Sequence, residues 1–272
     1  MVSMAGTLVA RIGYRGAGFS GFAEQPGQRT VARDLRIAFE TCLRRSVDIT
    51  CAGRTDAGVH AVAQYVSVPV TDPELALPGR RLTSSLVALT PDDISIKALY
   101  KARAGFSARS DALVRRYRYR ICCGYERPIM AWDHAWWLKT VPALDIGAMN
   151  KAAALLVGEH DFCSFCKAAS ASVVRAEGRS TSRLIVGIRV FPLREVEEDL
   201  VGIDVCGNAF LHNMVRIIVG SLVEVGRGHR SPAWLGDALA AHNRTAAGPT
   251  APAQGLTFDG VDYASGILSP WE

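Results

Sequence analysis

The stretch CAGRTDAGVHA, residues 51–61, joins a predicted helix to a predicted strand and places one carboxylate, Asp56, among small residues. Glycine has no Cβ, so Gly53 and Gly58 permit positive φ and let a bulky ligand come close to the backbone. Exposed loops of this kind often carry binding and catalytic residues. The same residues also suit a simple turn in which Asp56 caps its own backbone. The pattern alone therefore indicates either a tight turn or a catalytic loop.

The segments on both sides of this loop predict an α+β first half. A strand is predicted at residues 7–16, and apolar residues at helical spacing predict a helix at 31–45. After the loop, the sequence predicts a strand at 62–70, a helix at 80–89 and a strand at 93–102. This order is typical of a mostly antiparallel sheet with helices on one face.

The second half repeats the same order of elements without recognisable sequence identity to the first. The boundary is predicted near residues 107–113, which gives an N-terminal domain at 1–110 and a C-terminal domain at 111–272. The predicted elements of the second half are a strand from 115, a helix at 143–158, a hairpin of strands 182–193 and 199–210, helices at 212–228 and 232–243, and a loop at 245–255.

The composition fits a globular protein with a polyanionic partner. The chain has 272 residues and 49% hydrophobic composition, enough for one large core or two moderate ones. Its 31 basic and 26 acidic residues give a net charge of +5. There is no apolar run of membrane-spanning length and no secretory signal, which predicts a cytoplasmic protein with no membrane contact. An odd count of seven cysteines favours reduced thiols.

One cluster has spacing that a zinc site can use, namely His160, Cys163 and Cys166 in HDFCSFC. A structural zinc site normally has four ligands, and no second CxxC or HxxxH supplies the fourth. The sequence therefore predicts no metal here, and the cysteines are interpreted as small buried thiols.

The strand RRYRYR, residues 115–120, interleaves arginines with tyrosines. Because side chains alternate along a strand, one face carries three arginines and the other carries one arginine and both tyrosines. These two sets are Arg116, Arg118 and Arg120, and Arg115, Tyr117 and Tyr119. Such a strand suits stacked bases and phosphates. A solvated arginine face above a tyrosine core explains the pattern equally well.

The helix predicted within NAFLHNMVRIIVGSL, residues 208–222, contains one arginine, Arg216, among apolar residues. An unpaired buried charge is costly, so this guanidinium must find an acidic partner or reach solvent. The alternatives at this point are a buried counter-ion and an exposed arginine on an amphipathic helix.

These strings together resemble the signature of the TruA family of tRNA pseudouridine synthases. The resemblance rests on RTDAGVH at 54–60, RYRY at 116–119 and NAFLHNMVR at 208–216, with support from GEHDFCSF at 158–165 and AQGLTF at 253–258. It implies two ferredoxin-like (RRM-like) domains joined into one mostly antiparallel sheet. The helices would lie on the outer face, the RNA-binding catalytic cleft would be central, and the protein would be a homodimer.

The resemblance also assigns roles to individual residues. Asp56 would be the nucleophile and Arg216 its counter-ion, Arg54 would fill the gap left by the flipped base, and Tyr117 would stack on the uracil and help to move the C5 proton. The implied tRNA contacts are Tyr117, Arg54, His60, Arg116, Arg118 and Leu256. The substrate would be uridines 38, 39 and 40 of the tRNA anticodon stem-loop, without metal or cofactor.

Three departures from the family pattern lie outside these strings. Arg15 stands in GYRG where the family commonly has GYDG, Gly21-Phe22-Ala23 replaces GWQ, and LTSSLVALTP at 82–91 alters an LNxxLP pattern. They are predicted to affect RNA contact and domain packing and to leave the reaction unchanged.

Several alternatives stay open. Asp56 could attack C1′ of the ribose, stabilise an oxocarbenium-like centre, deprotonate the ribose to a glycal, or add to C6 of uracil. A non-catalytic RNA-binding protein would use the same basic, tyrosine-bearing sheet and would not need Asp56. A hydrolase with Asp56 as general base is disfavoured because no second carboxylate has a diagnostic spacing.

Overall fold

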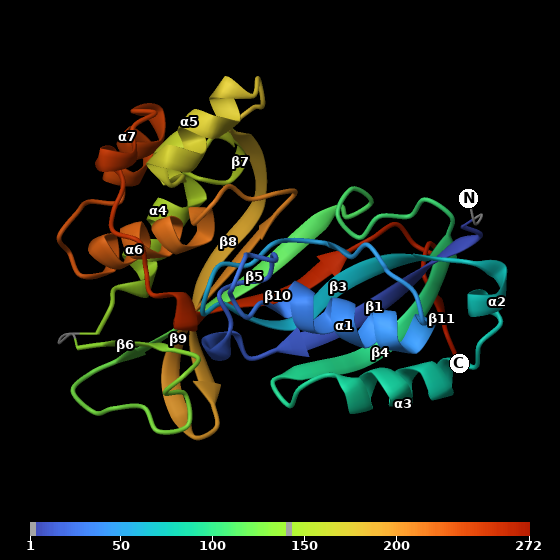
Figure 1. The fold of residues 1–272 in the computed structure, drawn as a ribbon. Coiled ribbons are helices and arrows are strands. Elements are labelled where there is room, and N and C mark those ends of the chain that lie inside the picture. The colour runs from blue at the N-terminus through green and yellow to red at the C-terminus, as the bar shows by residue number, and fades with distance from the viewer. Residues whose placement is uncertain (1–3, 140–142) are drawn as a thin grey trace. The chain divides into compact units, whose positions relative to one another are not determined.

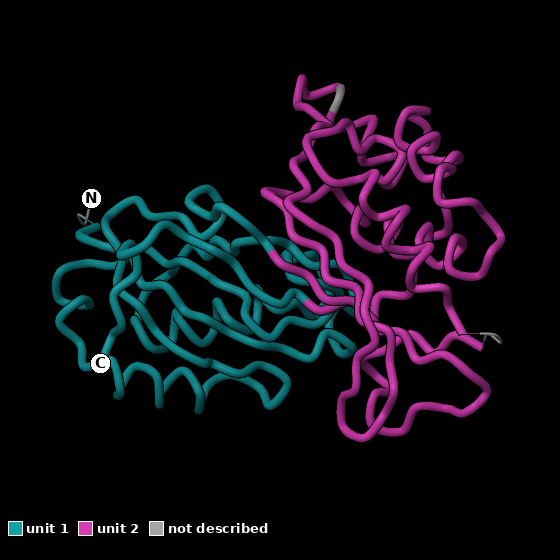
Figure 2. Tube along the Cα trace, turned by 180° about the vertical axis from the view of Figure 1, so that it is seen from behind, with its two compact units in different colours: residues 1–115, 258–272 teal, residues 116–257 magenta. Residues whose placement is uncertain are grey.

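A computed structural model describes residues 4–139 and 143–272, and the chain divides into two compact units. The first unit comprises residues 1–115 and 258–272, and the second comprises 116–257 (Figure 2). Each unit combines helices with mostly antiparallel strands, which confirms the predicted α+β class.

The division differs from the predicted one at the C-terminus. The sequence assigned all of 111–272 to the second domain, whereas the last residues belong to the first unit. Two contacts explain the difference: Trp271 N donates to Leu99 O at 2.9 Å, and the Tyr263 hydroxyl donates to Ala108 O at 2.8 Å. The chain therefore returns to its first unit after the second is complete.

Strands of the first unit follow the neighbour order β11-β4-β1-β3-β10, and β2 pairs with β3. The central strand β1 is antiparallel to both of its neighbours, with Ala10 opposite Val66 on β3 and Leu99 on β4. The strands are β1 (Gly6–Tyr14), β2 (Thr50–Cys51), β3 (His60–Val70), β4 (Ile94–Arg103), β10 (Leu256–Asp262) and β11 (Ser269–Pro270), of which β10 crosses the division between the units.

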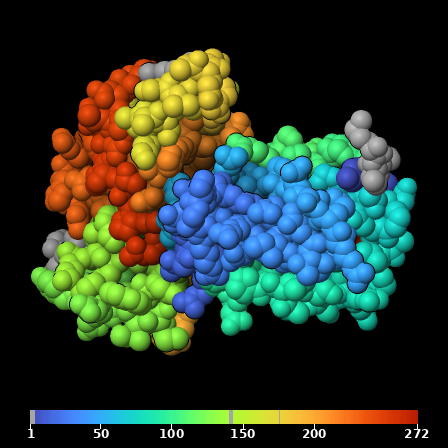
Figure 3. Space-filling model, viewed as in Figure 1, coloured from blue at the N-terminus to red at the C-terminus, as the bar shows by residue number. Residues whose placement is uncertain are grey.

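Helices of the first unit are η1 (Gly16–Gly18), α1 (Val31–Leu43), α2 (Asp72–Leu75) and α3 (Gly79–Leu89). Helix α1 begins where predicted because the Thr30 side chain accepts a hydrogen bond from Arg33 N, and it ends where Arg44 adopts a left-handed conformation. Its buried side includes Leu35 and Phe39, and the opposite side is at the surface seen in Figure 3.

In the second unit the strands follow the order β5-β9-β8-β7, and β6 runs parallel to β5. They are β5 (Val114–Cys123), whose first two residues belong to the first unit, β6 (Trp136–Leu138), β7 (Gly158–Asp161), β8 (Ser182–Glu195) and β9 (Glu198–Gly207). The helices are α4 (Ile146–Ala154), η2 (Cys163–Phe165), α5 (Ala168–Ala176), α6 (Met214–Gly226), α7 (Trp234–Ala240), η3 (Arg244–Ala246) and η4 (Ala253–Gly255). Helix α4 lies against β8 and α6 (Figure 1).

Three predicted helices are shorter than expected. The helix predicted at 143–158 begins after its cap Asp145 and ends early, because Gly158 has a φ of +114° and starts β7. The helix predicted at 212–228 begins at Met214, because Asn213 is left-handed with φ 62°. The third starts at Trp234, because Trp234 N donates to Ser231 O and Leu235 N to Pro232 O in a tighter i to i−3 pattern.

Two further features concern the predictions on membranes and metals. In the described ranges, helices long and apolar enough to cross a membrane are absent. The thiols of Cys163 and Cys166 are buried, as the sequence predicted, with exposures of 5% and 0%.

Candidate active site

The stretch around Asp56 forms a loop between β2 and β3 of the first unit. The Ala52 N–H donates to Tyr65 O at 2.9 Å, which fixes the start of the loop on β3. A tight turn closes it, with Val59 N donating to Asp56 O at 3.2 Å and Gly58 at a φ of +79°. The predicted turn therefore exists, and the main chain of Asp56 forms it. Asp56 itself is half-buried and Arg54 is exposed.

Two side chains from the strands beside this loop hold it in place. The Tyr14 hydroxyl lies 2.8 Å from Thr55 Oγ1, and Gln64 Nε2 donates to Gly53 O at 2.6 Å. Both supporting residues are buried, and both belong to the central strands β1 and β3. The loop is therefore tied to the sheet on each side of Arg54.

The segment of residues 15–22 lies directly against the same loop. Gly16 N donates to Nδ1 of His60 at 3.2 Å, and Phe22 N donates to Thr55 O at 3.0 Å. A Cβ on Gly16 would lie 2.1 Å from Val59 O, so this close approach requires glycine. His60, predicted to contact RNA, is 6% exposed and supports the segment.

An arginine clamp holds the segment in place. Arg29 donates two hydrogen bonds to Asp93, both at 2.8 Å, and its guanidinium lies 4.2 Å from the centre of the Phe19 ring. Ser20 N also donates to Arg29 O at 2.9 Å. Arg29 therefore holds the segment of residues 15–22 through an ion pair, a contact with an aromatic ring and a main-chain hydrogen bond.

The alternation predicted for RRYRYR is confirmed in β5. Arg115, Tyr117 and Tyr119 are 9%, 8% and 0% exposed, whereas the arginines between them are half-buried. Arg115 still belongs to the first unit, and its Nε donates to Ala52 O at 3.1 Å. Its guanidinium therefore supports the Asp56 loop.

The tyrosine face of β5 packs among aromatic and loop residues of the second unit. The Tyr117 ring meets Phe210 edge-on, with centroids 5.1 Å apart. The Tyr119 hydroxyl donates to Pro252 O at 2.8 Å. Leu256, predicted to contact substrate, is 5% exposed at the start of β10.

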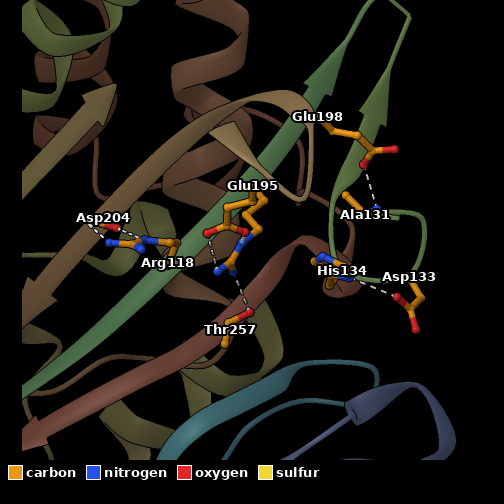
Figure 4. Close-up of polar contacts among 9 residues, drawn as sticks. Arg118, Ala131, Asp133, His134, Glu195, Glu198, Asp204 and Thr257 are labelled. Carbon is orange, nitrogen blue, oxygen red and sulfur yellow. Dashed lines mark hydrogen bonds and ion pairs between the residues drawn. The ribbon is translucent and has the colours of Figure 1, made fainter. Parts of the chain in front are cut away.

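The arginine face of β5 is occupied by ion pairs (Figure 4). Arg118 binds both oxygens of Asp204 at 2.7 and 3.0 Å. Arg120 binds both oxygens of Glu195 at 2.6 and 3.1 Å and also donates to Thr257. Burial would raise the pKa of Glu195, but the hydrogen bonds and charge of Arg120 outweigh it and lower that pKa overall.

The neighbouring loop of the second unit is held by a third carboxylate (Figure 4). Glu198 accepts main-chain hydrogen bonds from Met130 at 3.0 Å and Ala131 at 2.8 Å, and one from Ile129. The turn before Glu198 places Val196 and Glu197 in the left-handed region, which lets the strand β9 start beside this loop.

Arg216 lies half-buried in the first turn of α6. Its Nε donates to Ala251 O at 2.8 Å, and its Nη1 donates to Asn213 Oδ1 at 3.1 Å. A Cβ on Gly220 would lie 1.9 Å from Pro249 O, so the segment 247–252 can approach α6 only at a glycine. That segment, predicted as a loop, is therefore ordered against the helix.

The structure groups the predicted residues into two sets. Arg54, Asp56 and His60 belong to the first unit, and the remaining predicted residues belong to the second. In the second unit, Tyr119 and Arg216 both bond the adjacent carbonyls of Pro252 and Ala251, which joins the β5 and α6 motifs. These remaining residues are Arg116, Tyr117, Arg118, Arg216 and Leu256.

Sequence reasoning missed the residues that support the Asp56 loop. Tyr14 and Gly16 fall in GYRG, which entered the sequence interpretation only as a departure at Arg15. Gly16, at the end of the strand predicted at 7–16, was the available signal for a close backbone approach. Gln64 gave no such signal, since a polar residue in a strand normally faces solvent.

The chain is similar to known enzymes over nearly its whole length. The model of a family described as tRNA pseudouridine synthase matches residues 152–264. The chain is 40% identical over 264 residues to tRNA pseudouridine synthase A of Geobacillus kaustophilus, covering 94% of each chain. It is 38% identical to the enzyme of the same name from Streptomyces avermitilis, covering 94% of this chain and 88% of that one. For Brevibacillus brevis the identity is 40%, covering 93% and 97%.

Proposed function

The chain belongs to the tRNA pseudouridine synthase A family, and from that premise we propose that it isomerises uridine to pseudouridine in tRNA. The observation that carries the proposal is 40% identity across 94% of both chains. The loop around Asp56 supports it, because it presents a half-buried carboxylate beside an exposed arginine on a rigidly held turn.

The reaction breaks the N1–C1′ bond of uridine, turns the uracil and rejoins it through C5, with loss of the C5 proton and gain of one at N1. Nothing is oxidised and no group enters from outside. We assign the essential carboxylate to Asp56, whether it acts at C1′, on a ribose proton or at C6 of uracil. Each of these routes requires Asp56 in its ionised form.

The other roles follow from position and chemistry. A base inside a stem must leave the stack before it can react, and the exposed Arg54 can fill the resulting gap. Tyr117 offers a ring for the flipped uracil and a hydroxyl for the C5 proton. Arg216 is the proposed counter-ion of the Asp56 carboxylate.

The structure changes the weight given to the remaining predicted contacts. His60 accepts a hydrogen bond from Gly16 N, which favours a supporting role, and the pair between Arg118 and Asp204 favours a structural role for that arginine. Leu256 stays a proposed substrate contact. Arg116 stays a proposed phosphate contact. The resemblance further leads us to propose positions 38, 39 and 40 of the anticodon stem-loop, two ferredoxin-like domains, a homodimer and a cytoplasmic location.

Release of tritium from tRNA labelled at C5 of uridine tests the function. Isomerisation must remove that hydrogen, whereas binding alone cannot. We expect release by the wild type, none by Asp56→Asn, and unchanged tRNA binding in that variant. Asp48→Asn, which changes an exposed carboxylate just before β2, is the matched control and is expected to stay active.

Each contrary result is informative. A wild type that binds tRNA without releasing tritium would support the rival function, an RNA-binding protein without catalysis. Full activity of Asp56→Asn would show that another residue supplies the carboxylate or that none is needed.

A further inference from the structure

We propose that Tyr14 and Gln64 are positioning residues, which hold the main chain on both sides of Arg54 and thereby aim the Asp56 carboxylate. The inference rests on the proposed function, because it assigns Asp56 the chemical step. It adds two residues from β1 and β3 that lie outside the three motif strings.

The first anchor is a buried hydroxyl pair. Tyr14 is 5% exposed and Thr55 is 7% exposed, and their oxygens are 2.8 Å apart across 41 residues of sequence. Thr55 directly precedes Asp56, so the position of its side chain constrains the backbone that carries the carboxylate. The Thr55 carbonyl is fixed independently by Phe22 N at 3.0 Å.

The second anchor is a side-chain amide. Gln64 is completely buried, and its Nε2 donates to Gly53 O at 2.6 Å. Its Oε1 accepts from Tyr65 N at 3.1 Å, so the amide orientation is set from both ends. Because Gly53 and Thr55 flank Arg54, the two anchors fix the stem of the loop and leave the Arg54 side chain exposed.

The two anchors share one rigid base. Strands β1 and β3 pair directly, with Ile12 opposite Gln64 and Tyr14 opposite Ala61. The Tyr14 ring is held by Phe19 and Phe22, whose centroids lie 6.5 and 6.2 Å away. Burial raises the pKa of Tyr14, and this outweighs the opposing hydrogen bonds to Thr55 and Gln64. The phenol therefore stays protonated and keeps a hydrogen to donate.

These contacts matter for rate because they act beside the reacting group. A displacement of about 1 Å in a catalytic group can cost on the order of a hundredfold in rate. Sites work when the groups around the reacting residue lock its geometry. Loss of the Tyr14 hydroxyl should therefore lower kcat more than it lowers tRNA affinity.

A matched pair of variants separates positioning from stability. Tyr14→Phe and Tyr263→Phe each remove one hydrogen-bonded hydroxyl from the first unit, and the Tyr263 hydroxyl bonds Ala108 O at the same 2.8 Å. We expect both to lower Tm modestly. Tyr14→Phe should lower kcat for tritium release about tenfold or more with KM and tRNA Kd nearly unchanged, whereas Tyr263→Phe should keep its kcat.

Further variants test the route of the effect. Thr55→Val should reproduce the loss in Tyr14→Phe, the double variant should add little to it, and Thr55→Ser should preserve most activity because it keeps the hydroxyl. Gln64→Met should lower kcat in the same way. Hydrogen exchange at residues 53–59 should increase in Tyr14→Phe and not in Tyr263→Phe.

Two results would overturn the inference: wild-type kcat in Tyr14→Phe, or unchanged exchange of residues 53–59 in that variant. A wild type without tritium release would instead refute the proposed function. The exchange measurement still decides whether Tyr14 holds the loop in that event, so the two failures are distinguishable.

Discussion

Arg118 and Asp204 form a bidentate ion pair between β5 and β9, with nitrogen to oxygen distances of 2.7 and 3.0 Å. Both side chains are mostly buried, at 26% and 21% exposure, and Arg189 approaches the same carboxylate at 3.3 Å. The carboxylate offsets the charge that Arg118 would otherwise offer to RNA. Arg118 therefore links β5 to β9 through its ion pair with Asp204, although it lies in a strand whose arginines and tyrosines suit RNA binding.

This pairing predicts a difference between two arginines in the salt dependence of tRNA binding. Each lost phosphate contact lowers the slope of log K against log salt by about 0.7 to 0.9. We expect Arg116→Gln, which removes the proposed phosphate contact, to reduce the slope by about one contact and Arg118→Gln to leave it unchanged. Fluorescence anisotropy with labelled tRNA over a series of KCl concentrations measures both slopes. An equal reduction in Arg118→Gln would restore this residue as a phosphate contact.

Glu195 should make stability depend on pH in the acid range. Its pKa in the folded protein is lowered, since the bonds and charge of Arg120 outweigh the opposing effect of burial. The stabilisation is therefore present above the unfolded pKa of about 4.3 and is lost as pH falls through the lower folded value. We expect Glu195→Gln to be less stable than wild type by about 1 kcal/mol at pH 7, with the gap closing below about pH 4.

Thermal unfolding of both proteins between pH 3.5 and 7 measures this gap. Glu197→Gln is the control, because Glu197 is 90% exposed in its pair with Arg194 and should show no comparable gap. A Tm difference for Glu195→Gln that is constant with pH would contradict the assignment to its ionised form.

The local elements could be predicted from sequence because their causes are local. The two-residue period of RRYRYR separated its side chains into two faces, and the structure buries the face that carries Tyr119. Helix α1 was predictable from the helical spacing of its apolar residues, which the structure places on the buried side. Among the helices and strands of the described ranges, α2, α5, β2, β6, β7, β10 and β11 were not predicted. Strands of two or three residues, such as β11, depend on a partner strand and leave too few residues for a pattern.

The sequence motif of the candidate site was predictable, whereas the residues that hold the Asp56 loop in place were not. Asp56 stood out because glycines and an arginine surround it within a few residues. The contact between Tyr14 and Thr55 spans 41 residues, and that between Gln64 and Gly53 depends on a buried amide that no periodicity marks. The return of Tyr263 to Ala108 spans 155 residues. Such contacts follow from the fold and leave no trace in local sequence.

The close approach of residues 15–22 to the Asp56 loop predicts that Gly16→Ala is damaging. Its Cβ would lie 2.1 Å from the Val59 carbonyl oxygen, a backbone atom that cannot move aside cheaply. We expect the free energy of unfolding to fall by about 1–3 kcal/mol. We expect kcat to fall by more than this destabilisation explains, because Val59 belongs to the turn closed by Asp56. Chemical denaturation and tritium release measure the two effects.

Gly187→Ala is the matched control for that variant. Neither glycine has a positive φ, and a Cβ on Gly187 meets nothing within 4 Å. The control should therefore keep both stability and kcat close to wild type. If Gly16→Ala matched it in both measurements, residues 15–22 would not restrain the loop.

Arg216 should affect both folding and catalysis, and the chain offers a control that separates the two. Arg216 holds the segment 247–252 through Ala251 O, while Arg244 holds the same segment through Gly248 O at 2.9 Å and Thr250 Oγ1 at 3.2 Å. Alanine at either position should lower stability by about 1–3 kcal/mol because buried carbonyl oxygens lose their donors.

Only the counter-ion assignment predicts a further loss for Arg216. We expect Arg216→Ala to lower kcat for tritium release by about a hundredfold beyond Arg244→Ala, since the proposed counter-ion of Asp56 is gone. Arg216→Lys should recover part of kcat and little of the stability, because lysine restores the charge without the fork of directed N–H donors. Equal kcat in Arg216→Ala and Arg244→Ala would show that Arg216 only holds the segment 247–252 in place.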